Sequence, residues 1–208
     1  ALIAEILMGA QILRVPRVGK TIVMDLAREK GILSAQFLIH LGMTGRLLVS
    51  TPQTPIPPHT HANLSLRGGR ELRFVDARRV GRLSVVECTA EEPNLTYTGP
   101  GREPLTISLD DFIALFRGRK TPIKAALLNQ SLLHGVGNIY ADESLFHAGI
   151  RPRRQAGRIT RAQLSRLRDA LQSVLRHAIQ LGGSSVSDYV DADGVRGFFQ
   201  LEHRVYMR

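Results

Sequence analysis

A pair of glycines in the second half of the chain constrains its fold more than any other feature. A helical pattern over 124–130 is followed by Gly135-Val-Gly137, and a second helix is expected to begin at Asn138. Glycine tolerates positive φ and permits close approach of another backbone, so this spacing predicts two helices joined by a short turn, a shape that docks on nucleic acid. The N–H groups at the start of the second helix suit a phosphate, and Asn138 adds a side-chain donor. We therefore expect this turn to grip DNA.

The charge of the chain also favours a polyanionic partner. Lysine and arginine number 28 against 18 aspartates and glutamates, which gives a formal net charge of +10 at pH 7. Residues 1–108 hold 13 basic and 9 acidic residues, and residues 109–208 hold 15 and 9, so no single basic tail accounts for the excess. Such a balance suits nucleic acid, but it also suits simple solubility. Charge alone leaves both interpretations open.

The composition excludes several other classes of protein. Cys88 is the one cysteine, so a disulfide within the chain and a paired-cysteine zinc site are excluded, and we expect Cys88 to be a buried small hydrophobe. No apolar run approaches the length of a transmembrane helix. The first residues lack the basic start and cleavage site of a signal peptide. These features favour a cytoplasmic protein that has no membrane partner.

The first half of the chain alternates polar and apolar residues in short segments, which is the period of half-buried strands. A helix is expected over 2–7, and Gly68-Gly69 forms a hairpin turn. Residues 51–58 carry four prolines and are interpreted as a surface loop. The expected strands are two within 11–26, and one each over 33–41, 46–49, 61–66, 71–76 and 82–87. Short strands with frequent turns predict a β-sandwich.

The second half is predicted to be helical. The stretch 98–107 lies in a segment rich in Glu, Pro, Gly and Thr and is interpreted as a linker. Capping boxes at Ser108 and Thr160 open two helices, the second of which is amphipathic and ends at Gly182. Residues 184–200 are a polar loop, and 201–207 are expected to be extended. The sequence therefore predicts an α+β fold, with an N-terminal antiparallel β-sandwich over 1–97 and an all-α domain over 108–208.

Four short motifs follow one another along the chain: His40-Leu-Gly-Met-Thr-Gly45, Asp76-Ala-Arg-Arg-Val-Gly81, Gly135-Val-Gly-Asn-Ile-Tyr-Ala-Asp-Glu-Ser-Leu-Phe146 and Gly182-Gly-Ser-Ser-Val-Ser-Asp-Tyr189. In this order and spacing they resemble the formamidopyrimidine-DNA glycosylase and endonuclease VIII family, and within it the bacterial formamidopyrimidine branch. The likeness extends from Leu2 to Arg208. It implies a β-sandwich joined to a helix–two-turn–helix domain, working as a monomer on damaged double-stranded DNA in the bacterial cytoplasm, at the nucleoid.

The resemblance implies base-excision repair, in which oxidised purines such as 8-oxoguanine and formamidopyrimidines are removed and the strand is then cleaved. The target nucleotide is flipped out, because its sugar carbon cannot be reached inside the stack. Met43, Arg78 and Val80 match the family positions that fill the resulting void. The third is usually phenylalanine, and a valine cannot wedge between bases in the same way, so damage search or opposite-base selection is expected to change. The alternative is that Met43 and Val80 are ordinary core residues.

Other residues match family positions for chemistry and DNA contact. Lys20 matches the lysine that assists elimination and touches the phosphate beside the lesion, where an ammonium is favoured by Coulomb attraction; the alternative is a solvated lysine at a strand end. Contacts to the DNA backbone fix register without reading sequence. The matching positions are His40, His61, Arg79, Arg119, Lys124 and Asn138.

A lesion pocket is implied by two further positions. Glu143 matches a buried family carboxylate and is interpreted as a positioning group, not a proton donor. Tyr189 lies in the loop 184–199, which matches the segment that covers the everted base. Loops that close on a ligand are commonly mobile and contain glycine, as this one does at Gly194.

The chain also departs from the family pattern. The family nucleophile is an N-terminal proline amine followed by a catalytic glutamate, and no residues here match them. The four-cysteine zinc finger at the family C-terminus is also unmatched, so no metal or other cofactor is expected in this chain. The 208 residues taken alone are therefore expected to be inactive.

Three hypotheses follow. The first is a bifunctional DNA glycosylase and lyase. The second is a catalytically inactive DNA-binding protein of the same fold. The third treats only the two helices and their turn as meaningful, as in a ribosomal or topoisomerase module, and the motif at His40 argues against it.

Overall fold

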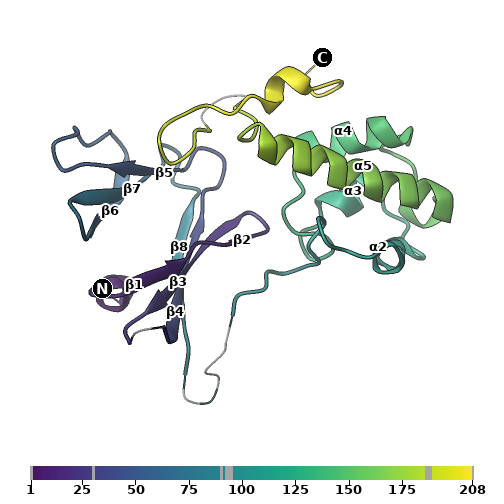
Figure 1. The fold of residues 1–208 in the computed structure, drawn as a ribbon. Helices are drawn as coiled ribbons and strands as arrows, with labels where there is room; N and C mark the ends of the chain where they lie inside the picture. The colour runs from purple at the N-terminus through teal and green to yellow at the C-terminus, as the bar shows by residue number, and fades with distance from the viewer. Residues whose placement is uncertain (1, 30, 90, 92–95, 186–188, 208) are drawn as a thin grey trace. The chain divides into compact units, whose positions relative to one another are not determined.

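The chain forms two compact units, which are described separately. A computed structural model describes residues 2–29, 31–89, 91, 96–185 and 189–207. The β unit comprises Ala1–Thr98 and Ser185–Arg196, and the helical unit comprises Gly99–Ser184 and Gly197–Arg208 (Figure 1). Within the described residues, no helix is both long enough and apolar enough to cross a membrane.

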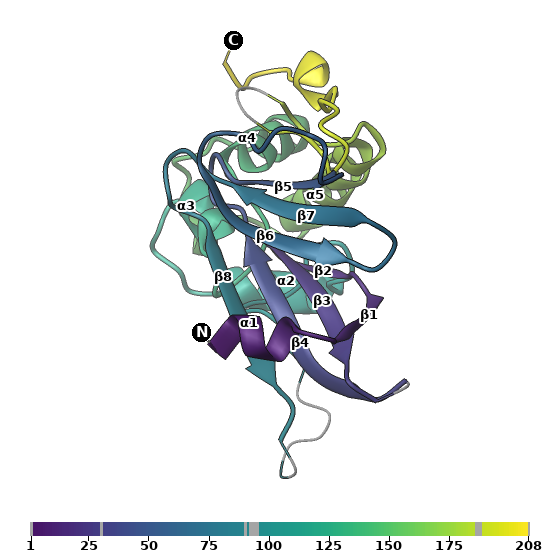
Figure 2. The ribbon, with the colours of Figure 1, turned by 90° about the vertical axis from the view of Figure 1, so that its left-hand side faces the viewer.

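The β unit holds two antiparallel sheets, as the alternating pattern predicted. The larger sheet has the order β1-β3-β4-β8, with β2 beside β3, and the smaller has the order β5-β7-β6. Figure 2 shows the strands of one sheet crossing those of the other. The element bounds are α1 Leu2–Leu7, β1 Gln11–Arg14, β2 Arg17–Val18, β3 Thr21–Ala27, β4 Leu33–His40, β5 Arg46–Ser50, β6 Thr60–Leu66, β7 Arg70–Val75 and β8 Arg82–Glu87.

One apolar core joins the two sheets and α1, which confirms the predicted sandwich. Phe37 and Ile39 from β4 pack with Leu47 from β5 and Phe74 from β7, and Ile6 covers them from α1. Burying side chains of this size stabilises the fold by about 1.5–3 kcal/mol each. The stretch 11–26 differs from expectation, because it forms three strands instead of two. Its turn before β3 uses Gly19, at φ 60°.

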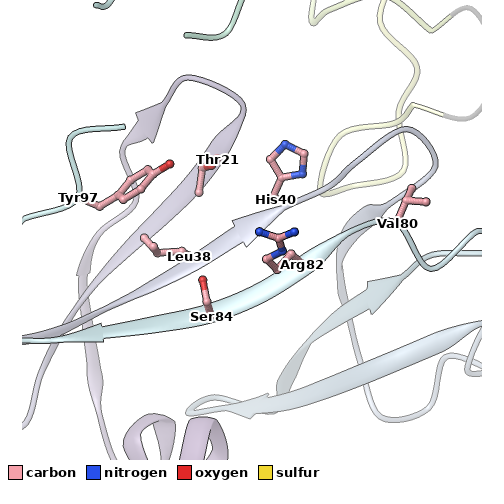
Figure 3. Close-up of a pocket in the computed structure, with 7 residues that line it drawn as sticks. All are labelled: Thr21, Leu38, His40, Val80, Arg82, Ser84 and Tyr97. Atoms are coloured by element: carbon pink, nitrogen blue, oxygen red, sulfur yellow. The ribbon is translucent and has the colours of Figure 1, made fainter. Parts of the chain in front are cut away.

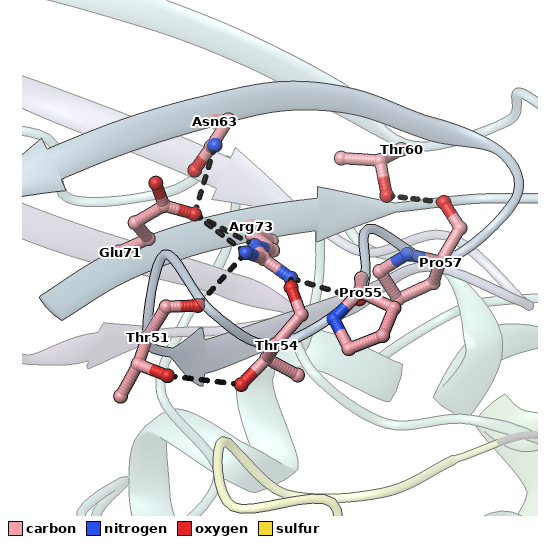
Figure 4. A network of polar contacts seen from close by, with 8 residues as sticks. All are labelled: Thr51, Thr54, Pro55, Pro57, Thr60, Asn63, Glu71 and Arg73. Carbon is pink, nitrogen blue, oxygen red and sulfur yellow. Dashed lines mark hydrogen bonds and ion pairs between the residues drawn. The ribbon is translucent and has the colours of Figure 1, made fainter.

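The proline-rich loop after β5 is held by one buried arginine. Arg73 on β7 is only 1% exposed, and its guanidinium donates to the carbonyls of Thr51, Thr54 and Pro55 at 2.9–3.0 Å (Figure 4). A carboxylate oxygen of Glu71 completes the set, at 2.7 Å from Nη2. A guanidinium can be buried because each donor finds an acceptor, so the loop lies on the surface with a fixed path.

The helical unit is built around a long amphipathic helix. Leu167 and Leu171 of that helix, α5, are fully buried with Phe112 and Phe116 of α2. Both predicted N-caps are present: Ser108 Oγ accepts from Asp111 N–H at 3.1 Å, and Thr160 forms a capping box with Gln163. The bounds are α2 Leu109–Phe116, α3 Ile123–Leu128, α4 Asn138–Ala148, the 3₁₀ turn η1 Ala156–Arg158, α5 Arg161–Gln180 and the 3₁₀ turn η2 Phe199–Glu202.

The predicted linker is part of the helical unit over most of its length. Arg102 N–H donates to the Leu132 carbonyl at 2.9 Å, and His134 N–H donates to the Arg102 carbonyl at 3.1 Å. Ile107 is buried in the helical core. Composition suggested a spacer, but backbone pairing and one apolar anchor attach the segment 99–107 to the helices.

Two predictions for the end of the chain also need correction. Residues 185–196 belong to the β unit, where Val49 N–H donates to the Ala192 carbonyl at 2.8 Å, although the loop 184–199 was assigned to the helical domain. Residues 201–207 are not extended: η2 includes the first two, and Phe199 anchors it in a small apolar cluster. Tertiary contacts decide both segments.

Candidate functional site

A buried carboxylate joins two turns at one end of the β unit. Asp76 is 0% exposed. It accepts from Thr44 Oγ1 at 2.5 Å, from Arg78 N–H at 3.2 Å and from Gly81 N–H at 2.7 Å. Burial raises the pKa of Asp76, but bonds from Thr44 and from the backbone of Gly81, Arg78 and Val80 outweigh it, so the pKa is lowered. The group therefore stays an ionised acceptor.

The two turns present the three predicted void-filling residues together. Met43 is 70% exposed and Val80 is 48% exposed, so neither is a core residue and that alternative is excluded. Arg78 Nη1 lies 3.7 Å from Met43 Sδ. The turns touch at Gly42, where an added Cβ would lie 2.9 Å from a Val80 methyl and where φ is 67°. A glycine is needed here for both reasons.

Two predicted DNA-contact residues, His61 and Arg79, lie beside Asp76. His61 Nε2 is 2.9 Å from the Asp76 carbonyl, and the side chains of both predicted contact residues are exposed. Arg79 has φ 55°, which is uncommon for a residue other than glycine. With Phe74, Gly81 and Leu83 these residues line a hollow of about 400 Å³.

A second hollow, of about 330 Å³, lies on the larger sheet (Figure 3). His40 is one of its lining residues, and its Nδ1 accepts from Gly42 N–H at 3.2 Å. Burial lowers the pKa of His40, and the charges of Lys20 and Arg82 lower it further, which favours neutral imidazole. The lining residues are Thr21, Leu38, His40, Val80, Arg82, Ser84 and Tyr97.

Lys20 lies next to this hollow, directly before β3. Most of the Lys20 residue surface is exposed to solvent. Neighbouring protein atoms nevertheless displace part of the water around the ammonium, and this desolvation lowers its pKa. The exposed group keeps much of its hydration, which limits this effect. A lysine with a lowered pKa exchanges protons more readily near neutral pH.

The glycine turn of the helical unit is held by one side chain. Gln130 Oε1 accepts from Gly135 N–H at 3.0 Å, and Gln130 Nε2 donates to the Val136 carbonyl at 3.0 Å. Gly135 has φ 90°, whereas Gly137 has φ −116°, a conformation open to any residue. No side chain caps α4 within the described residues, and Asn138 at its start is exposed. The first N–H groups of α4 are therefore open to an anion.

Two predicted contact residues of this unit have partners already. Lys124 Nζ is 2.8 Å from Asp142 Oδ1, so a phosphate would share that ammonium with a carboxylate. Arg119 is exposed, and its Nε donates to the Leu115 carbonyl at 2.6 Å. Its backbone is packed tightly against Gly157, whose N–H donates to the Arg119 carbonyl at 2.9 Å. The DNA roles of both stay predictions.

Glu143 is a clamp inside the helical unit. It is 1% exposed and accepts from the backbone N–H groups of Arg204, Val205 and Tyr206 at 2.8–3.0 Å. Burial raises the pKa of Glu143, but these three bonds and the nearby His203 outweigh it, so the pKa is lowered. A carboxylate with this many donors suits positioning better than proton transfer.

Tyr189 lies in the β unit, so its predicted place beside Glu143 in one lesion pocket stays a prediction. Its carbonyl accepts from Ser185 Oγ at 2.7 Å. Burial and the charge of Asp191 raise the pKa of its phenol. Asp191 Oδ1 accepts from the N–H groups of Asp193 and Val195 and shapes the end of this loop. Residues 186–188 lie outside the described part.

The sequence did not indicate a role for three residues, two in the β unit and one in the helical unit. Asp76 stood in a quoted motif without a role, although its place directly after an apolar strand was a usable signal. Gln130 and Arg82 gave no local signal. No group of three or more His, Cys, Asp or Glu in the described part is arranged to hold a metal ion, and the expectation of no cofactor stays a prediction.

The architecture and the site together match one class of protein, with a β-sandwich followed by helices that carry a glycine turn. Residues 1–83 match the formamidopyrimidine-DNA glycosylase N-terminal domain, and residues 100–190 match the formamidopyrimidine-DNA glycosylase H2TH domain. The chain is 48% identical over 203 residues to formamidopyrimidine-DNA glycosylase of Solibacter usitatus, covering 97% of this chain and 72% of the relative. The chain belongs to the formamidopyrimidine-DNA glycosylase family, which is a family of enzymes.

Solved structures agree with this assignment. The MutM (Fpg) protein of Thermus thermophilus is 41% identical, with a TM-score of 0.82 over 96% of this chain and 73% of that one. A complex of Lactococcus lactis Fpg with DNA containing an abasic site is 28% identical, with a TM-score of 0.86 over 99% of this chain and 74% of that one. The predicted fold and family are confirmed.

Proposed function

We propose that this chain acts in base-excision repair, removing oxidised purines such as 8-oxoguanine and formamidopyrimidines from double-stranded DNA by base flipping. The observation that carries the proposal is the joint exposure of Met43, Arg78 and Val80 on two turns held by Asp76. The complexes of a Lactococcus lactis Fpg mutant with DNA containing Fapy-dG and of Lactococcus lactis Fpg with DNA containing an abasic site support it. The relatives named here are bacterial, and we place the protein, as a monomer, on DNA in the bacterial cytoplasm.

The roles of the three exposed residues follow from the cost of flipping. Extruding a nucleotide costs a few kcal/mol of stacking and pairing, and side chains that enter the gap offset part of it. Met43 is long and adaptable, and Arg78 beside it adds a charge that can face the unpaired base. Val80 is short and fills less of the gap than an aromatic ring, so we expect a weaker hold on the distorted duplex.

Lys20 is proposed to act in strand cleavage. In the elimination step a proton leaves the sugar next to C1′ and the bond to the 3′ phosphate breaks. An ammonium beside that phosphate stabilises the developing charge, and its lowered pKa lets it exchange a proton. His40, with its ring proton free on Nε2, can donate to the same backbone.

We further propose that none of the 208 residues supplies the attacking amine, the α-amine of Ala1 included, so that they alone bind damaged DNA without cutting it. Lys20 directly precedes Thr21, which lines the hollow on the larger sheet, and the proposed role of Lys20 is with the phosphate. The proposed chemistry uses no metal ion bound by these residues.

The test is trapping with borohydride on a duplex containing 8-oxoguanine. The 208 residues should give no covalent adduct, and the same chain preceded by a Pro-Glu start should give one. An adduct on the 208 residues would contradict the assignment of the amine. Failure of the extended chain to distinguish damaged from undamaged duplex, and to form any adduct, would favour the alternative of a DNA-binding protein without activity.

A further inference from the structure

Three polar residues form a row across the larger sheet. Thr21 on β3 is opposite His40 on β4, and His40 is opposite Arg82 on β8. Residues directly opposite each other in antiparallel strands place their side chains on the same face of the sheet. Figure 3 shows the His40 ring and the Arg82 guanidinium side by side above this face, in the hollow of about 330 Å³. Register thus brings Arg82 to the site.

The row has positive charge without a matching carboxylate. Lys20 directly precedes Thr21, so two cations flank His40, and both of their charges lower its pKa. Among the described residues no ion pair involves Lys20, His40 or Arg82, whereas Arg73, Lys124 and Arg161 each have a carboxylate partner. Like charges held together in this way repel one another unless an anion binds between them.

His40 adds a directed donor to the same place. A backbone N–H can only donate, so the bond from Gly42 makes His40 Nδ1 the acceptor. The ring proton is then on Nε2. The hollow is therefore lined by an imidazole N–H and a guanidinium, and the Lys20 ammonium is near enough for its charge to act on His40. All three groups are donors.

We propose that Arg82 is a phosphate-binding residue that holds the DNA backbone in this hollow beside His40 and Lys20. The inference rests on the proposed function and adds to it a contact that sequence reasoning did not assign. A guanidinium can make two parallel bonds to one phosphate, which fixes orientation as well as adding attraction. A solvated arginine at a strand start is the competing interpretation, and it predicts no phosphate dependence.

The experiment compares Arg82→Gln with Arg67→Gln, which removes the same charge from the exposed turn between β6 and β7. Binding to 8-oxoguanine and undamaged duplexes is measured by fluorescence anisotropy over a salt series. Arg82→Gln should lose affinity by on the order of tenfold, and the slope of log K against log salt should fall by about 0.9, the value for one phosphate. Arg67→Gln should match the unsubstituted chain.

A methylphosphonate scan makes the test specific. One neutral linkage is placed in turn at each position near the lesion. At one position it should weaken the unsubstituted chain and leave Arg82→Gln unaffected, because the lost contact is the same. Arg82→Lys should recover the salt slope but only part of the affinity, since an ammonium lacks the fork.

The outcomes separate the inference from the function. Equal affinity and slope for Arg82→Gln and Arg67→Gln, with unchanged circular dichroism, would overturn the role of Arg82. The unsubstituted chain could bind damaged and undamaged duplexes equally while the salt slope of Arg82→Gln still fell by the value for one phosphate. That result would contradict the proposed lesion function and support the phosphate contact of Arg82. Absence of duplex binding at low salt would overturn both.

Discussion

Two buried carboxylates, one in each unit, use the same chemistry for different purposes. Asp76 and Glu143 are both almost fully buried, both accept several N–H bonds, and both have a lowered pKa. The donors to Asp76 lie on two turns, and the donor from the first turn is the hydroxyl group of Thr44. The donors to Glu143 lie on one segment, 204–206. The first arrangement shapes a surface that carries exposed residues, and the second fixes the path of the chain.

This difference shows why burial alone does not define a functional carboxylate. Neither group has a lysine or arginine partner among the described residues, so backbone N–H groups replace water around each charge. The two carboxylates differ in which side chains lie on the segments that donate to them. The Asp76 turns carry Met43, Arg78 and Val80, whereas the segment at Glu143 packs beside η2.

The largest effect is expected for Asp76→Asn. The amide would point its N–H groups at a backbone donor, either Gly81 N–H or Arg78 N–H, and one bond would become a clash. We expect a loss of about 2–3 kcal/mol in the free energy of unfolding, together with weaker binding to damaged duplex. Urea unfolding and anisotropy measure the two. Unchanged stability would mean that Asp76 does not organise the turns.

Glu143→Gln should have a smaller effect, of about 1–2 kcal/mol on unfolding. One oxygen is kept and can still accept from Val205 and Tyr206, while Arg204 N–H loses its partner. Amide hydrogen exchange should increase at 204–206 and not at the Asp76 turns. If exchange instead increased at residues 76–81, the two carboxylates would not be independent.

The pH dependence of stability follows from the direction of both pKa shifts. Above the unfolded-state pKa of about 4, each group is ionised in both states and its contribution is fully present. As pH falls below that value the unfolded chain binds protons first, so stability is lost as pH falls through the lowered folded-state pKa. Urea unfolding from pH 7 to pH 3 should show this fall. Each of the two amide variants should show a shallower curve, and parallel curves would contradict the assignment.

The smallest effect on stability is expected for Val80→Phe. The side chain is 48% exposed, so unfolding should change by no more than about 0.5 kcal/mol. Discrimination of 8-oxoguanine duplex from undamaged duplex should increase, because a ring fills more of the gap left by a flipped base. Ile32→Phe, at a 59% exposed position directly before β4, serves as the matched control and should leave discrimination unchanged.

Most of the fold could be predicted from local pattern, and the errors have physical causes. The strand over 82–87 and the helix starts after Ser108 and Thr160 were predicted correctly, because alternation and capping act over a few residues. The predictions for the segments 98–107 and 201–207 were wrong, because the groups that bind their backbones, Leu132 and Glu143, are far away in the chain. Polar composition does not distinguish a free loop from one that is bonded to a distant helix.

The sequence by itself determined which residues face a core, where helices begin and where a glycine is needed, since these depend on spacing along the chain. The tertiary structure alone decided that Thr44 reaches Asp76, that Glu143 holds 204–206, and that Arg82 stands beside His40. These pairs are separated by dozens of residues, and strand register or helix packing joins them. Side-chain chemistry can be read locally, but the partner of a charge is set by the fold.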